Sequence, residues 1–198
     1  AATVRYVPID PDAPRHVLET APEPGTEPGI DAAPLAAPAL SDIPWLGVTG
    51  GTTGLPKGVE MSWLALNAFV QKYVGEVPTP SPVMLLATPL THGAGMLAMP
   101  TFARGGTVVI AEGLVPQQFL DLIETHRVNE CFLPPTGIYK LLDEPSVRGR
   151  DFTSLTNFVY GAAPISIPRL RHASEVFGPV MTQAYGQTEC HTLVTMMK

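Results

Sequence analysis

Short apolar segments alternate with longer amphipathic segments along the chain from residue 45 onward. Brief apolar runs bounded by turn-forming residues are typical of buried strands, and they predict strands at residues 45–49, 83–87, 107–110, 130–133, 157–160 and 180–184. Apolar residues at helical spacing predict one helix after Ser62, a suitable N-cap, and others at residues 95–102, 116–126, 136–142 and 167–177. This alternation predicts an α/β fold with a layered, mostly parallel β-sheet and helices on both faces.

The first 44 residues differ in composition from the rest of the chain, because nine of the chain's 22 prolines fall in them. Proline lacks a backbone donor, and this composition offers little apolar surface to bury. We therefore expect residues 1–44 to form an extended segment or linker, in which Thr3–Val7 is a candidate short strand, and residues 45–198 to form the α/β core.

Residues 77–103 contain no Asp, Glu, Lys or Arg and are long enough to span a bilayer. Five prolines within them exclude a continuous helix, so a buried strand, loop and helix are expected and no transmembrane segment. The start of the chain lacks the charged and apolar regions of a secretory signal.

Charge and cysteine content narrow the class of partner. The net charge is −6, so the chain lacks the broad basic surface that nucleic acids or anionic membranes require. Cys131 and Cys190 have no metal-ligand spacing, which argues against a disulfide scaffold and against a zinc site. We expect a reducing, cytoplasmic setting and small-molecule partners, with the oligomeric state left open.

The strongest chemical signal is the run TGGTTGLPKG from Thr49 to Gly58. Its glycines let backbone N–H groups turn toward one point, its threonines add hydroxyl donors and Lys57 adds a positive charge, which together make a phosphate cradle. A Walker A loop would end in Gly-Lys-Ser/Thr, whereas here Pro56 precedes the lysine and Gly58 follows it. The alternative is a Gly-rich hairpin with an exposed lysine.

This run resembles the signature loop of the adenylate-forming superfamily, which includes acyl- and aryl-CoA synthetases, firefly-type luciferases and the adenylation domains of nonribosomal peptide synthetases. The usual form is Thr-Ser-Gly-Thr-Thr-Gly-x-Pro-Lys-Gly, and Gly50 here replaces the serine and removes one hydroxyl donor. Three further segments are similar to the family's motifs and follow in the family's order: PLTHGAG from Pro89, GAAP from Gly161 and YGQTE from Tyr185. The resemblance covers residues 45–197.

The resemblance implies ATP-dependent activation of a carboxylic acid to an acyl-adenylate and then to an acyl-CoA, with ATP, Mg²⁺ and coenzyme A as cofactors. It implies catalytic roles for Lys57, Thr188, Glu189 and His92, with Glu189 supporting the Mg²⁺ and His92 beside the substrate carboxylate. The nucleotide-binding residues that it implies are Thr49, Gly50, Gly51, Thr52, Thr53, Gly54, Lys57, Gly161, Ala162, Ala163, Pro164, Tyr185, Gly186 and Thr188.

The acid itself is expected to be lipophilic. No Asp or Glu lies between Glu76 and Glu112, so an amino acid's ammonium group would lack a partner there. The expected pocket walls are Met96, Leu97, residues 132–136, Tyr160, Gly161 and Ala184. An adenylation unit that loads a carrier protein and a noncatalytic nucleotide-binding module are the two alternatives.

Several residues also have a structural interpretation. His92 could be a hydrogen-bonded core histidine, and Tyr185 could be ordinary core packing. Glu189, Cys190 and His191 are consecutive, and on a strand they could not all face one metal ion. The pairs Arg148/Arg150 and Arg169/Arg171 are most simply solvated charge.

The family's ribose-binding Asp and its C-terminal domain with a second lysine are missing, so we expect a fragment that is inactive alone.

Overall fold

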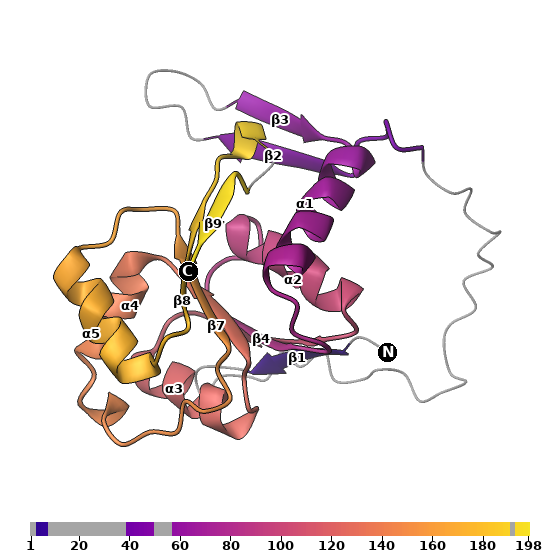
Figure 1. Ribbon diagram of the computed structural model, residues 1–198. Helices are drawn as coiled ribbons and strands as arrows, with labels where there is room; N and C mark the ends of the chain where they lie inside the picture. Colours follow the sequence, from indigo (N-terminus) through magenta and orange to yellow (C-terminus); the bar gives the residue numbers. More distant parts are fainter. Residues whose placement is uncertain (1–2, 8–38, 50–56, 191–192) are drawn as a thin grey trace, which may run out of the picture.

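The computed structural model describes residues 3–7, 39–49, 57–190 and 193–198 (Figure 1). Within these residues the strands form two sheets. The larger is seven-stranded, in the order β1-β5-β4-β6-β7-β8-β9. Its strands are β1 (Thr3–Val7), β4 (Val83–Leu86), β5 (Thr107–Ala111), β6 (Glu130–Leu133), β7 (Asn157–Gly161), β8 (Met181–Tyr185) and β9 (Thr195–Met197).

All pairs in this sheet are parallel except β8 with β9, which confirms the predicted α/β fold with a mostly parallel sheet. The candidate strand Thr3–Val7 is confirmed as β1 at one edge, beside β5. The division of the chain at residue 44 stays a prediction.

The smaller sheet corrects one expectation. β2 (Trp45–Thr49) does not join the parallel sheet but pairs antiparallel with β3 (Lys57–Met61), in register from Trp45 opposite Met61 to Thr49 opposite Lys57. The apolar pattern did not predict β3, because only Val59 and Met61 of its five residues are apolar. The short C-terminal strand β9 was not predicted either.

The helices lie close to the predicted positions: α1 (Trp63–Glu76), α2 (Gly93–Ala103), α3 (Pro116–Thr125), α4 (Pro135–Leu142) and α5 (Ile167–Phe177). Ser62 is confirmed as the N-cap of α1, since its Oγ accepts a hydrogen bond from the Ala65 N–H at 3.3 Å. Two short 3₁₀ helices, η1 (Pro145–Val147) and η2 (Thr188–Cys190), complete the described elements. No helix in the described ranges combines the length and apolar character that a membrane crossing requires.

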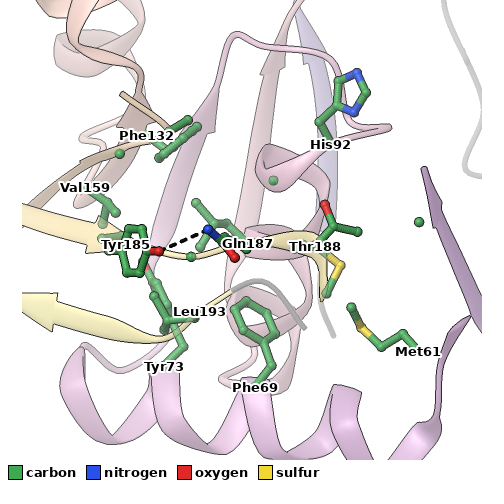
Figure 2. A pocket seen from close by; sticks show the side chains of 18 of the residues that line it. Met61, Phe69, Tyr73, His92, Phe132, Val159, Tyr185, Gln187, Thr188 and Leu193 are labelled. Atoms are coloured by element: carbon green, nitrogen blue, oxygen red, sulfur yellow. Dashed lines mark hydrogen bonds between the residues drawn. The ribbon is translucent and has the colours of Figure 1, made fainter. Parts of the chain in front are cut away.

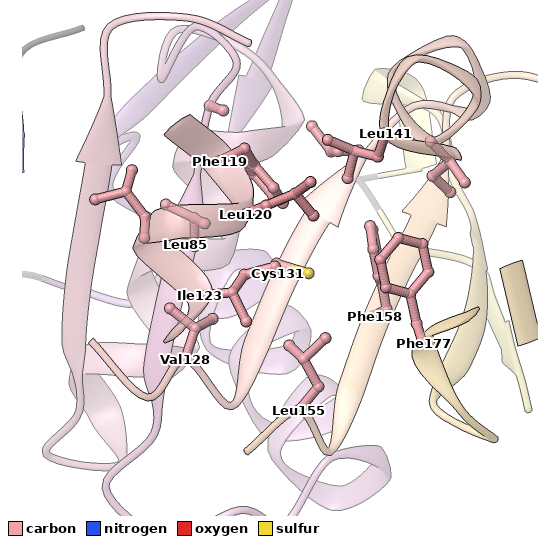
Figure 3. Close-up of a cluster of buried hydrophobic side chains, with 14 of the residues drawn as sticks. Leu85, Phe119, Leu120, Ile123, Val128, Cys131, Leu141, Leu155, Phe158 and Phe177 are labelled. Atoms are coloured by element: carbon pink, nitrogen blue, oxygen red, sulfur yellow. The ribbon is translucent and has the colours of Figure 1, made fainter. Parts of the chain in front are cut away.

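Alternation along the strands divides the core between the two faces of the large sheet. On β4, Leu85 packs with α3, α4 and α5, whereas Met84 and Leu86 pack with α1 and α2. We call these the α3–α5 face, part of which is drawn in Figure 3, and the α1–α2 face. Residues 77–103 supply β4, a loop and α2, which confirms the expected buried strand, loop and helix.

One arginine of each pair, Arg150 and Arg169, is held by an ion pair, whereas Arg148 and Arg171 are exposed as expected. Arg150 is not simply solvated: its guanidinium pairs with Glu124 at 2.9 Å and donates to the Ser146 carbonyl, which ties the loop after η1 to α3. Arg169 makes a bidentate pair with Asp143 at 2.7 and 2.9 Å and so joins α5 to the end of α4.

Candidate active site

Loops at the carboxyl ends of the parallel strands meet α1, α2 and the β2–β3 hairpin around a cavity of about 330 Å³ (Figure 2). This is the edge of a parallel sheet at which α/β proteins bind ligands. The lining comes from widely separated parts of the chain: Trp45, Gly47, Met61, Phe69, Tyr73, Thr91, His92, Gly93, Met96, Leu97, Phe132, Val159, Gly161, Ala162, Ala184, Tyr185, Gly186, Gln187, Thr188 and Leu193.

The strand β2, which precedes the Gly-rich segment in the sequence, lies against η2. Gly47 is buried on β2, and a Cβ at this position would come within 2.7 Å of Thr188 Cγ2. The strand that enters the loop therefore runs against the 3₁₀ helix that contains Thr188 and Glu189, two residues far away in the sequence. Figure 1 shows η2 beside β2 at one end of the molecule.

The loop itself, with Gly50, Gly51, Thr52, Thr53 and Gly54, lies outside the described residues. Its two ends are the paired strands β2 and β3, so the backbone on either side of it is a hairpin. A hairpin and a phosphate cradle are compatible, because a hairpin connection can still turn its N–H groups toward one point. The roles of Thr49 and Lys57 stay predictions.

His92 is the residue before α2 and is exposed at the cavity. Its interpretation as a buried core histidine is therefore wrong. The turn around it depends on Gly95, since a Cβ there would lie 1.8 Å from the carbonyl oxygen of Leu90. That turn holds the imidazole at the rim (Figure 2).

Tyr185 ends β8 and is 51% exposed, so its interpretation as core packing is also wrong. Its hydroxyl accepts a hydrogen bond from Gln187 Nε2 at 3.1 Å, drawn as the dashed line in Figure 2. A half-exposed aromatic ring at a cavity offers a flat apolar face on which another ring can stack.

Gly161 and Ala162, at the end of β7, form the neighbouring part of the lining. A Cβ at Gly161 would lie 2.3 Å from the carbonyl oxygen of Ala184 on β8, so only glycine fits between the two strands. Ala162 has a φ of +66°, in the left-handed region that residues other than glycine seldom adopt. Ala163 and Pro164 are exposed and are not among the lining residues.

Hydrogen bonds hold the segment that follows β8. The Val194 N–H donates to the Tyr185 carbonyl at 2.8 Å, and the Cys190 N–H donates to the Gln187 carbonyl at 3.1 Å. The Lys72 ammonium of α1 donates to the Val194 carbonyl. These contacts fix η2 between the cavity and β2.

The walls of the cavity differ in part from the expected ones. Met96, Leu97, Phe132, Gly161 and Ala184 are confirmed as lining residues. Residues 133–136 and Tyr160 are not lining residues. Leu133 and Tyr160 alternate with lining residues on their strands and belong to the α3–α5 face.

The sequence did not predict the lining residues of α1 and the hairpin, which are Trp45, Met61, Phe69 and Tyr73. It also missed Val159 on β7 and Leu193 before β9. The helical spacing of Phe69 and Tyr73 was the available signal, but it indicates only an inward face. It does not distinguish packing from lining.

Burial shifts the acidity of one group at the site. Loss of solvation, followed by the neighbouring Glu130 carboxylate, raises the pKa of Tyr73 well above its ordinary value of 10.0. The phenol is therefore neutral at physiological pH and keeps its proton as a hydrogen-bond donor.

The residues present fit a nucleotide-borne Mg²⁺ better than a metal ion held by the protein. No group of three His, Cys, Asp or Glu side chains that could hold a metal occurs among the described residues. Glu189 is exposed on η2 beside Thr188 and is not a lining residue. One carboxylate can complete the coordination of a Mg²⁺ ion whose other ligands include phosphate oxygens.

The sequence model of the family described as "AMP-binding enzyme" matches residues 2–198. The chain belongs to the AMP-binding enzyme family. The α/β fold is also the one seen in solved structures of this family, including the amide bond synthetase McbA from Marinactinospora thermotolerans. That structure has 37% sequence identity and a TM-score of 0.73, over 76% of this chain and 30% of the other.

Two relatives have different named activities. The medium/long-chain fatty acid–CoA ligase FadD8 of Mycobacterium tuberculosis is 35% identical over 167 residues, which are 83% of this chain and 29% of that protein. The fatty acid–[acyl-carrier-protein] ligase ScoC of Streptomyces coeruleorubidus is 33% identical over 153 residues, which are 71% of this chain and 28% of that protein. The chain thus spans about three tenths of the length of these family members.

Proposed function

We propose that this chain contributes the ATP and acid sites of an enzyme that activates a lipophilic carboxylic acid as its acyl-adenylate and then transfers the acyl group to coenzyme A. The observation that carries the proposal is the contact of Gly47 with Thr188. It brings the strand that leads into the candidate phosphate loop against the residues expected at the α-phosphate.

The lining of the cavity supports an uncharged tail. Among the described residues the lining contains no Asp, Glu, Lys or Arg, so a substrate with a second charge would find no partner among them. Part of the lining is apolar and is formed by Met61, Phe69, Met96 and Leu97. His92 and Thr188 contribute polar side chains to the rest of it. A molecule with a polar head and an apolar tail matches this division.

In the proposed reaction, a carboxylate oxygen of the acid attacks the α-phosphorus of ATP. The new P–O bond forms as the bond to pyrophosphate breaks. The chain's own part is to position the reactants and to offset charge: Thr49, Thr52, Thr53 and Lys57 at the β- and γ-phosphates, Thr188 at the α-phosphate, and Tyr185 with Gly161 and Ala162 against adenine. Glu189 would hold a Mg²⁺, which would neutralise phosphate charge when bound.

In the second step, the thiol sulfur of the acceptor attacks the acyl carbonyl carbon, AMP leaves, and the thiol proton is released. The carrier-protein alternative has a specific basis, because ScoC is named as a ligase for an acyl-carrier protein. The FadD8 ligase, at higher identity, favours coenzyme A. Titration of coenzyme A and of a phosphopantetheinyl carrier into the chain saturated with an acyl-adenylate mimic separates the two.

The proposal is tested by calorimetry with ATP and with decanoyl adenosine sulfamate, a nonhydrolysable mimic of an acyl-adenylate. An adenylating site binds the mimic more tightly than ATP, whereas a noncatalytic nucleotide module gains nothing from the acyl tail. Lys57→Ala and Glu189→Ala should each weaken ATP binding by about tenfold to a hundredfold, the usual range for a hydrogen bond to a charged group.

Two matched controls lie on exposed helix surfaces away from the cavity. Lys140→Ala on α4 and Glu175→Ala on α5 remove the same charges and should leave ATP binding unchanged. Equal losses of ATP affinity in the site variants and in the controls would show that the effect comes only from the change in net charge. Full ATP affinity in Lys57→Ala or Glu189→Ala would refute their assigned roles.

A further inference from the structure

The side chain of Tyr73 forms part of the buried wall of the cavity. This residue borders the cavity and is 0% exposed to solvent, so it belongs to the closed wall of the cavity and not to its open mouth. It lies on α1, one turn after Phe69, which also lines the cavity. Figure 2 shows both side chains on that helix, below Tyr185 and Gln187.

A buried charged pair lies behind the ring. Glu130, at the start of β6, is 0% exposed. The Arg104 guanidinium donates to both of its carboxylate oxygens, at 2.6 and 2.9 Å. The Tyr73 hydroxyl donates to the Glu130 carboxylate at 3.2 Å.

Arg104 is itself held in place. Its guanidinium donates to the carbonyl oxygens of Val77, at 2.8 Å, and Pro100, at 2.9 Å, and so joins the end of α1 to the end of α2. The same group lies over the Tyr73 ring, with 5.4 Å between the guanidinium carbon and the ring centroid. The ring is therefore fixed at its hydroxyl by a carboxylate and at its face by a cation.

This clamp makes Tyr73 a stiffer wall than an ordinary core residue. A Leu or Met side chain can change rotamer when a ligand presses on it. Tyr73 can move only by giving up its hydrogen bond to a buried carboxylate, which would leave that carboxylate with one donor fewer. A tail that reaches the ring meets a surface that does not yield.

We propose that Tyr73, clamped by Glu130 and Arg104, is the specificity-determining residue that sets the longest acyl tail the cavity accepts. The inference rests on the proposed function, since it takes the cavity to hold the tail of the acid. Phe132 is two residues after Glu130 on the same face of β6 and lines the cavity. Glu130 therefore lies about 7 Å from Phe132 along β6, toward the start of the strand.

The test uses the 198-residue chain and a series of acyl adenosine sulfamates with saturated tails from hexanoyl to hexadecanoyl, titrated by calorimetry. In the unaltered chain, affinity should rise with each added methylene and then fall at a definite length. In Tyr73→Ala that limit should move to longer tails, with roughly tenfold tighter binding for every two further methylenes accommodated.

Tyr73→Phe keeps the ring but loses the hydrogen bond to Glu130, so the limit should become less sharp and should move by less than in Tyr73→Ala. Leu120→Ala is the matched control on the α3–α5 face, where it should lower stability without moving the limit. If Tyr73→Ala does not fold in a thermal unfolding assay, Tyr73→Leu takes its place and should shift the limit by less.

The outcomes separate the two proposals. A folded Tyr73→Ala or Tyr73→Leu chain with an unchanged limit overturns the role of Tyr73 and leaves the proposed function standing. The same shift in Leu120→Ala overturns that role too, because the effect would then come from loosened packing. If the unaltered chain binds none of the sulfamates, whatever the tail, the proposed function fails and this inference fails with it.

Discussion

The two faces of the seven-stranded sheet are built from the same strands, but one is closely packed and the other contains a cavity. The α3–α5 face is a continuous apolar cluster, in which Phe119, Leu120, Ile123 and Phe158 have at most 1% of their surface exposed. The α1–α2 face carries buried polar residues, namely Glu130, Asn157 and Thr182, and it contains the cavity.

The difference between the faces shows how a single sheet can supply both stability and a binding site. Close packing on the α3–α5 face supplies stabilising burial. On the other face, the side chains that line the cavity lack packing partners on one side. Directional polar contacts such as the Glu130–Arg104 pair hold the walls of the cavity in place.

The largest effect is expected at the buried ion pair. Glu130→Ala leaves the Arg104 guanidinium, 7% exposed, without its carboxylate, and should lower the free energy of unfolding by about 3–5 kcal/mol in urea denaturation. The control is Arg127→Ala, which breaks an exposed pair with Asp151 and should change stability little. Similar losses for the two variants would mean that the pair on the cavity face is no structural clamp.

The next largest effect compares the same truncation on the two faces. Leu120→Ala, in the packed cluster, should cost about 3–5 kcal/mol, whereas Leu97→Ala, whose side chain already borders the cavity, should cost about 2 kcal/mol or less. Chemical denaturation of both variants gives the two values. Equal losses would show that the α1–α2 face is as tightly packed as the other.

A smaller effect is expected where β7 and β8 touch beside the cavity. Gly161→Ala places a Cβ 2.3 Å from a backbone oxygen that cannot rotate away, and should lower stability by about 1–3 kcal/mol. Gly75→Ala in α1 meets nothing within 4 Å and should raise stability by about 0.5 kcal/mol, because alanine favours the helix. The sign of the thermal shift distinguishes them, and a stabilised Gly161→Ala chain would contradict the close contact.

Each face also contributes one buried acid to the pH dependence of stability. Burial, and after it the Glu130 charge, raises the pKa of Cys131 on the α3–α5 face from its ordinary value of 9.0, as it does for Tyr73 on the other face. Each group keeps its proton longer in the folded chain than in the unfolded one. Stability is therefore complete below the unfolded pKa values and falls as the pH rises above about 9 and then 10.

Each of these two groups contributes a slope of at most about 1.4 kcal/mol per pH unit. Tyr73→Phe should remove only the part that begins above pH 10, as measured by urea unfolding between pH 8 and pH 11. An unchanged slope in that variant would mean that Tyr73 has the same pKa in the folded and unfolded chains.

The repeating part of the fold was predictable from the sequence. β6 and α5 have the predicted bounds, and the predicted N-cap Ser62 starts α1, because apolar periodicity and capping are local signals. β3 and β9 were missed because short strands at or near a sheet edge bury few side chains and leave little pattern. Leu133 and Tyr160 were misplaced as walls, although strict alternation along their strands assigned them to the opposite face.

The candidate site was predictable in its outer part only. Motif residues such as His92, Tyr185 and Thr188 were expected at the cavity and line it. Phe69 and Tyr73 were assigned to a helix face without a role, since an inward apolar position looks the same in sequence whether it packs against a neighbour or borders a cavity. That distinction depends on how well the opposing surface fits.

By itself, the order of residues determined the alternation of strands and helices, the parallel arrangement that follows from it, the family and the loops in which polar chemistry could gather. These properties depend on neighbours within a few positions along the chain. Tertiary structure alone decided that Gly47 would meet Thr188, and that Tyr73 would join Glu130 and Arg104 behind the cavity. Contacts between residues so far apart form only when whole elements pack, because the shape and burial that select them do not exist until the elements meet.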